Sequence, residues 1–426
     1  MDIVKLSLFG GGNMSERLRG TLGLLKGNLG IMCLSSGLWR LAGALTWPFF
    51  SLYLLGLGAT YFHVGLVLAV GSICSIVPLF FGGYLADIIG RKRLIVTMSF
   101  LMSGMYIIYS QAPVWEYILA AEILNGLFSG LREPAFSALI ADSTRPRNRA
   151  LAYVIWERIP EIFAILSPTI AGICIDQYGV VSAMRWFYLA VFAMSFTASV
   201  IRFKFLDEAF LGQLPEQASV MRGFTAPIRQ IRESVKVVPR QIWIITIISF
   251  VSSLGFAMTD PFWVTYAVED VMGLKASEWG FISTTLIILG IVFSIPCGMA
   301  SDRYGRLSLI IPSMFLSSAT IALFPFCSGF TQVILVRSIL DLSIYSLYVP
   351  ARSALATDYS PKMHRGRITA MTMIVNSPWP VLGNLLGGYF YQNVSKQLPF
   401  ILFSVLAGLT AILFLLFAKE PTKRED

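Results

Sequence analysis

Ionisable side chains stand inside several long apolar stretches of this sequence. The stretch 330–357 carries Arg337, Asp341 and Tyr345 at intervals of four residues, which places them on one face of a helix. A charge within an apolar span costs roughly 3 kcal/mol on insertion scales, so such residues indicate a function. An arginine and a carboxylate that pair in one state and separate in another can take up and release a proton. The alternative is an i,i+4 pair that only neutralises itself.

Other apolar stretches contribute candidates for the same solute or proton pathway. Asp260 has no basic partner within a turn of its own helix, so it either pairs with Arg40 or Arg337 or carries the proton itself. Asn376 is a candidate solute contact, although the prolines that follow it can simply kink the helix. The full set of candidates is Arg40, Trp47, Glu122, Asp260, Trp263, Arg337, Asp341, Tyr345 and Asn376.

A further group of charged residues lies in the stretches 114–141 and 151–175, toward the ends that we assign to the cytoplasmic side. Both signs of charge are present, so we expect the two stretches to pair with one another and the group to be structural. Its members are Arg132, Glu133, Glu157, Arg158 and Glu161.

The elements that must position these residues are long and apolar. The chain is 56% hydrophobic and only 13% charged, whereas soluble domains carry roughly 25% charged residues. Its apolar blocks are about 20 residues long, enough to cross a hydrocarbon core of about 30 Å. The sequence therefore predicts an all-α integral membrane protein with twelve transmembrane helices near 31–55, 64–86, 94–112, 114–141, 151–175, 182–205, 241–269, 277–300, 307–327, 330–357, 365–391 and 398–418.

The net charge of +9 reports topology. Most Lys and Arg residues fall in the tail and the loops on one side of the predicted membrane, which is the positive-inside pattern of a plasma-membrane protein. We therefore expect both termini in the cytoplasm and no nucleic-acid partner. The five cysteines lie in apolar runs at unrelated spacings, and the two histidines lie apart in loops, so no disulfide framework or metal site is predicted.

A long polar stretch divides the chain into two halves. Within it, residues Ile228–Val238 alternate apolar and basic positions with helical periodicity, which predicts a helix on the cytoplasmic surface. The expected organisation is a cytoplasmic N-terminal tail over 1–30, a six-helix half over 31–205, a cytoplasmic linker over 206–240, a second six-helix half over 241–418 and a C-terminal tail over 419–426.

A short charged turn occurs once in each half. Gly82–Leu94 reads GGYLADIIGRKRL, and Gly298–Ile310 repeats its pattern as GMASDRYGRLSLI. Glycines permit close helix contact, and the carboxylates can accept hydrogen bonds at a helix N-terminus and pair with an arginine. We expect a cytoplasmic latch that breaks in one state, the alternative being a static loop clamp. The residues are Gly83, Asp87, Gly90 and Arg91, and Gly298, Asp302, Gly305 and Arg306.

These repeated turns, with twelve predicted spans, resemble the major facilitator superfamily. The first copy departs from the family pattern at Ile88, where arginine is usual, and the second has Ala300 where leucine is usual. The resemblance covers all twelve spans and implies two pseudo-symmetric six-helix bundles related by a parallel repeat. It also implies solute transport by alternating access, with the stretches 31–55, 114–141, 241–269 and 330–357 lining a central cavity.

The expected activity is therefore secondary transport, and the protein is not expected to be an enzyme. The chain lacks a phosphate-cradling GxxxxGK[ST] loop, so we expect a proton gradient as the energy source, with Asp260, Glu122 or Asp341 as the proton carrier and no bound cofactor. Residues 167–172 resemble the antiporter pattern of the family, which favours efflux of drug-like or amphipathic compounds. Uptake of a small organic solute, anionic or sugar-like, is the alternative, and a non-transporting sensor or scaffold a remote one. The expected partners are the lipid bilayer and a small solute, bound by a monomer.

Overall fold

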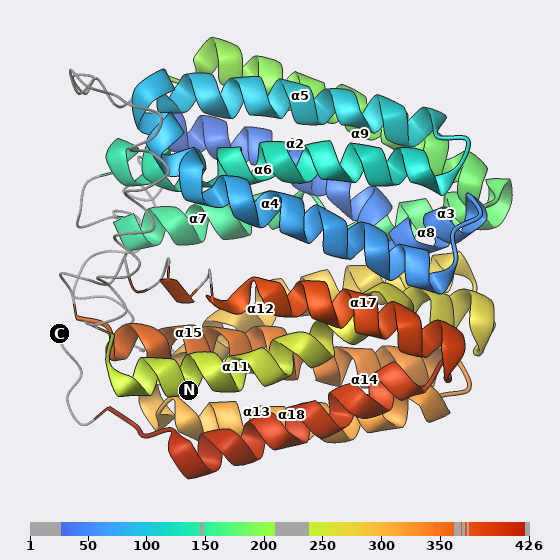
Figure 1. Cartoon of the computed structure of the whole chain (residues 1–426), viewed down its shortest axis with the longest axis vertical. Helices are drawn as coiled ribbons and strands as arrows, with labels where there is room; N and C mark the ends of the chain where they lie inside the picture. Colours follow the sequence, from blue (N-terminus) through green and yellow to red (C-terminus); the bar gives the residue numbers. More distant parts are fainter. Residues whose placement is uncertain are drawn as a thin grey trace, which may run out of the picture.

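The computed structural model describes residues 27–144, 149–208, 238–361, 368, 371–372 and 375–421. These residues are almost entirely helical, and the helices form two bundles, one from each half of the chain (Figure 1). The predicted surface helix Ile228–Val238 falls, apart from Val238, outside the described residues. Most of both predicted tails does so as well. The all-α fold class is confirmed.

The N-terminal bundle is built from eight helices. They are α2 (Asn28–Thr46), α3 (Phe50–Gly56), α4 (Tyr61–Ile89), α5 (Arg91–Gln111), α6 (Trp115–Ser143), α7 (Arg149–Ile162), α8 (Ser167–Tyr178) and α9 (Val180–Phe205). Helices α2 and α3 form one broken span, and so do α7 and α8. This gives six spans.

The C-terminal bundle repeats this plan. Its helices are α11 (Arg240–Thr259), α12 (Ala276–Tyr304), α13 (Leu307–Leu323), α14 (Phe330–Asp341), α15 (Val349–Asp358), α17 (Pro378–Asn393) and α18 (Leu398–Phe417). Ten helical spans among the described residues are long and apolar enough to cross a membrane. The other two are α6, in which Glu122, Arg132 and Glu133 lower the hydropathy, and α17, of which 16 residues are described. With these two, the described residues contain twelve spans.

Prolines break the first span of each half at equivalent places. The turn η1 (Trp47–Phe49) follows α2, and the turn η3 (Asp260–Phe262) follows α11. Pro48 and Pro261 lack the N–H that an α-helix needs, so each span tightens there into a single 3₁₀ turn. The break places Trp47 and Asp260 at matching points of the two bundles.

Two spans that we predicted as single stretches are also interrupted. The fifth leaves the α-helix after Ile162 and resumes at Ser167, one residue before Pro168. The tenth contains a π-helical segment, η6 (Leu342–Tyr348), between α14 and α15, and Pro350 follows it. Proline removes a backbone donor, and the helix absorbs the change by local rewinding.

The two bundles contact each other near one end of the molecule. We call the end with the charged turns at Arg91 and Arg306 the hinge end, and the opposite end the far end. Helix α4 packs against α17, and α8 packs against α12, across the boundary between the bundles (Figure 1). A Cβ added at Gly65 would collide with the backbone oxygen of Asn384, and one at Gly172 with that of Ala276. Glycine is therefore required at both far-end seams.

Candidate functional site

A central cavity lies between the bundles on the hinge side of these seams. Its largest part has a volume of about 830 Å³, and two adjoining parts have about 360 and 150 Å³. Trp47 lines all three parts. Asp260, Arg337 and Tyr345 each line two of them. The predicted pathway residues that line them are Arg40, Trp47, Asp260, Trp263, Arg337, Asp341 and Tyr345.

Arg337 is held in this cavity by aromatic rings. Its guanidinium carbon lies 4.3 Å from the centroid of the Trp263 ring and 5.9 Å from that of Trp279. Such a cation–π contact is worth roughly 2 kcal/mol when desolvated. The Nε of Arg337 and the indole N–H of Trp263 are both buried without a hydrogen-bond partner. The guanidinium is thus held by its contacts with the two rings, and its Nε hydrogen is left unpaired.

Arg337 and Asp341 line the cavity, and the alternative, an i,i+4 ion pair between them, is absent. Among the described residues, no carboxylate oxygen lies within 4.0 Å of the Arg337 guanidinium, from Asp341 or from Asp260. Arg40 likewise makes no such ion pair with Asp260. Asp341 lies one turn from Arg337 on α14, and Asp260 lines the same part of the cavity as Arg337. Two acids and one base therefore share a cavity without forming a fixed pair.

Aromatic side chains provide the apolar surface of the cavity. Trp47 is 59% exposed and Tyr345 is 46% exposed, and both line it. Phe256 lies edge-on to Tyr345, with ring centroids 6.0 Å apart. The cavity therefore combines aromatic surface with charged side chains.

Two predicted pathway residues line none of the three parts of this cavity. Glu122 accepts a hydrogen bond of 2.6 Å from the hydroxyl of Tyr109, within a cluster of tyrosines in the N-terminal bundle. The distance between the centroids of Tyr109 and Tyr188 there is 5.0 Å. Asn376 is half-buried, and its Oδ1 has no partner. Spacing assigned Glu122 to the cavity, but spacing does not give the rotation of a helix about its axis.

The group predicted to be structural lines the cavity. Arg132, Glu133, Glu157, Arg158 and Glu161 all border its largest part. The ion pairs are Arg132 with Glu133 at 3.2 Å and Arg158 with Glu161 at 3.2 Å, each within its own span. The expected pairing between the spans is therefore wrong. The long side chains of Arg132 and Arg158 reach a carboxylate on their own helix instead of one on the neighbouring span.

Arg202 is a cavity residue that the sequence analysis did not single out. It is 2% exposed, and its guanidinium donates to the hydroxyls of Ser35 and Ser99, both at 2.9 Å. Its guanidinium carbon lies 4.8 Å from the Phe136 ring. Arg202 lies in the last turn of α9, where a basic residue usually marks the cytoplasmic end of a span. Only its burial, which the sequence does not show, distinguishes it from such a residue.

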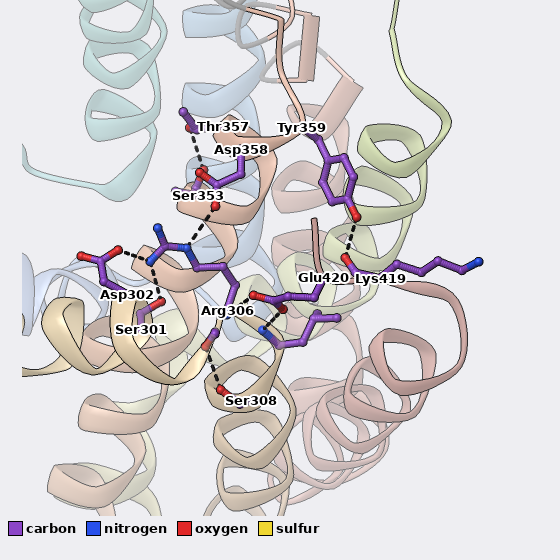
Figure 2. A network of polar contacts seen from close by, with 12 residues as sticks. Ser301, Asp302, Arg306, Ser308, Ser353, Thr357, Asp358, Tyr359, Lys419 and Glu420 are labelled. Atoms are coloured by element: carbon purple, nitrogen blue, oxygen red, sulfur yellow. Dashed lines mark hydrogen bonds and ion pairs between the residues drawn. The ribbon is translucent and has the colours of Figure 1, made fainter. Parts of the chain in front are cut away.

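The two charged turns at the hinge end form equivalent ion pairs in the two bundles. Arg91 forms ion pairs with Asp142 and, at 3.6 Å, with Asp87. Arg306 forms the equivalent pairs with Asp358 at 3.2 Å and with Asp302 at 2.5 Å (Figure 2). Each set of partners belongs to the same bundle as its arginine. Whether these turns also latch the bundles together in another state stays a prediction.

Each turn also includes a carboxylate that the sequence analysis missed. Glu420 accepts the backbone N–H of Arg306 at 2.7 Å and that of Leu307 at 3.0 Å, capping α13 (Figure 2). Glu208 accepts those of Arg91 and Lys92 at 3.1 and 3.0 Å, capping α5. Both glutamates follow the last helix of their bundle, so the internal repeat was the signal that could have found them.

The glycines of the turns match the expected close helix contact only in part. Gly90 and Gly305 have φ angles of +100° and +97°, a region that L side chains rarely adopt. Gly83 and Gly298 were expected to allow close helix contact, yet a Cβ at Gly298 would meet nothing within 4 Å and one at Gly83 only Pro134 at 3.9 Å. The close approach occurs at Gly82, against the backbone oxygen of Leu131.

Curated relatives align with almost the whole chain. It is 24% identical to the uncharacterized MFS-type transporter YqjV of Bacillus subtilis, over 91% of this chain and 92% of that protein. It is 25% identical to the multi-drug resistance efflux pump PmrA of Streptococcus pneumoniae, over 93% and 98%. The multidrug resistance protein MdtG of Salmonella heidelberg is 24% identical, over 90% and 92%.

Solved structures share the fold. The inward open conformation of the xylose transporter XylE from E. coli superposes with a TM-score of 0.67 at 15% identity, covering 96% of this chain and 97% of that one. The family model described as Major Facilitator Superfamily matches residues 32–274 and 245–426. The chain belongs to the Major Facilitator Superfamily and is a membrane transporter of that fold.

Proposed function

We propose that this transporter exports aromatic, amphipathic compounds from the cell and that entry of protons drives it. The observation that carries the proposal is the joint presence of Asp260, Asp341 and Arg337 in one aromatic-lined cavity, without an ion pair within 4.0 Å. An acid that is near an arginine but not bonded to it can exchange a proton as the distance between them changes. The names of PmrA and MdtG support the direction of transport.

The hinge end faces the cytoplasm in this proposal, and both termini lie there. The far-end seams at Gly65 and Gly172 and the cavity on their hinge side support a state that is closed outside and open inside. Rocking of the two bundles about the cavity would open the far end in turn. We propose that the monomer in the plasma membrane is the working unit.

A second candidate is uptake of a small organic anion. Arg40 and Arg337 both line the largest part of the cavity, and in the described part of the chain neither has a carboxylate oxygen within 4.0 Å. Either guanidinium could bind a carboxylate. The mixed charge of the cavity and the exposed Trp47 favour a larger amphipathic solute.

A proteoliposome assay separates these candidates. Purified protein is reconstituted, a pH gradient is imposed, and movement of ethidium, an aromatic cation, is compared with that of radiolabelled benzoate. The proposal predicts ethidium transport that a protonophore abolishes. Benzoate transport alone would support the second candidate. Absence of both gradient-driven transport and counterflow with either probe would contradict the proposal and favour a sensor or scaffold.

A further inference from the structure

A buried carboxylate joins the two bundles at the far end. Asp270 ends the π-helical turn η4 (Thr265–Asp270) of the C-terminal bundle, and its side chain is 4% exposed. It accepts hydrogen bonds from the hydroxyls of Tyr61 at 2.5 Å and Tyr391 at 2.7 Å, and it pairs with Lys396 at 2.5 Å. Tyr391 and Lys396 belong to its own bundle. Tyr61 belongs to the other.

The fold holds Tyr61 at this position. Tyr61 is the first residue of α4, and Thr60 and His63 form a capping box that fixes the start of that helix. A Cβ at Gly388 would lie 2.8 Å from the backbone oxygen of Tyr61, so α17 passes directly against it. The next amide, that of Phe62, donates to Gln392 at 2.9 Å. The Tyr61 hydroxyl is therefore directed across the boundary by rigid helix ends.

The strength of this contact follows from its charge and burial. A hydrogen bond to a charged group is stronger than a neutral one, and a buried carboxylate that loses a donor retains the cost of its desolvation. Two tyrosines and one lysine together satisfy Asp270. When the bundles separate at the far end, Asp270 must lose its hydrogen bond from Tyr61 and keep its contacts with Tyr391 and Lys396.

The same contact is connected to the solute cavity. Asp260, which lines the cavity, and Phe262 are the first and last residues of the turn η3. The Phe262 ring is stacked on that of Tyr391, with centroids 4.6 Å apart. Tyr391 in turn donates to Asp270. A shift of η3 on binding of a solute or proton at Asp260 would thus reach Asp270 through one ring contact.

We propose that Asp270 and Tyr61 form the gate of the far end, and that breaking their hydrogen bond is an obligatory step of transport. The inference rests on the proposed function insofar as it requires alternating access. Asp270 acts here as a positioning residue: it stabilises the closed far end and does not touch the solute. A second contact supports the same state, since the carboxylate of Asp176 in α8 accepts the backbone N–H groups of Ala276 and Ser277 at the start of α12, at 2.9 and 3.0 Å.

Two tyrosine variants test the gate. Tyr61→Phe removes the hydrogen bond to Asp270 that joins the two bundles. Tyr391→Phe removes a hydrogen bond to the same carboxylate from within its own bundle. Spin labels are attached at Tyr117 and Val394, two exposed far-end positions in different bundles, in a variant without its five native cysteines. Distances are measured by pulsed electron paramagnetic resonance without any solute.

The gate predicts that Tyr61→Phe raises the ratio of the long to the short distance population about tenfold, the equivalent of one hydrogen bond to a charged group. Tyr391→Phe should leave the ratio within about twofold of the parent. An equal rise in both variants, or none in Tyr61→Phe, would overturn the gate. Because this readout needs no transport, such a result is distinguishable from a failure of the ethidium assay.

Discussion

The guanidinium carbon of Arg337 lies 4.3 Å from the ring centroid of Trp263, and no carboxylate of the described chain pairs with it. Arg337 is held against the Trp263 ring and shares the cavity with Asp341 and Asp260. This geometry places the planar guanidinium against an aromatic ring and leaves both carboxylates available to a solute or a proton. The proposed coupling depends on this separation.

Stacking on Trp263 requires a planar cation, so Arg337→Lys should impair transport even though the charge is kept. We expect a loss of about tenfold in the rate of counterflow, which corresponds to much of a desolvated cation–π contact. Arg303→Lys is a matched control, since Arg303 lies 5.3 Å from the ring of Tyr304 on the exposed hinge end. Equal activity of both variants would show that the stacking is unimportant.

Glycine at the far-end seams should be required for closure. Gly65→Ala and Gly172→Ala would each force a Cβ against backbone of the other bundle. We expect both variants to shift toward an open far end and to lose at least about tenfold in counterflow, because backbone cannot yield as a side chain can. Gly104→Ala is the control: Gly104 is helical, and a Cβ there meets nothing within 4 Å. A thermal-stability assay separates misfolding from a shifted equilibrium, and normal transport by Gly65→Ala would refute the argument.

The carboxylates that cap α5 and α13 should stabilise the hinge end. Glu420→Gln removes the charge at a helix N-terminus and leaves one carbonyl oxygen where Arg306 and Leu307 now bond to two carboxylate oxygens. The side chain belongs to an exposed residue, so the cost is about 0.3–1 kcal/mol. We expect a small decrease in the melting temperature, and a similar one for Glu208→Gln because the repeat is symmetric. A decrease in only one variant would show that the two hinges differ in stability.

The sequence predicted the architecture well because its signals are local. Apolar blocks, basic loops and the repeated turns at Asp87 and Asp302 each need only a short window of residues. The same windows could not show how each helix is rotated about its axis. Glu122 and Arg337 occupy matching places in the two halves, yet Arg337 lines the cavity and Glu122 lies among tyrosines.

Long-range contacts account for what the sequence analysis missed. Asp270 acquires its role from Tyr61, which is 209 residues away, and Glu420 from Arg306, 114 residues away. Neither pair has a spacing that indicates contact. Proline positions were visible, but the π-helical segment before Pro350 depends on packing as well as on the missing donor.

The central claim is that protons drive transport through the cavity acids, with Asp260 as the first choice. Asp260→Asn keeps the shape and removes the ionisable group, and Glu122→Gln is the matched control, because Glu122 lines none of the three parts of the cavity. The decisive measurement compares ethidium accumulation driven by a pH gradient with ethidium counterflow in the same proteoliposomes. We predict that Asp260→Asn lowers gradient-driven ethidium accumulation at least about tenfold and keeps ethidium counterflow, while Glu122→Gln keeps both activities. Gradient-driven accumulation by Asp260→Asn equal to that of the parent protein would contradict it.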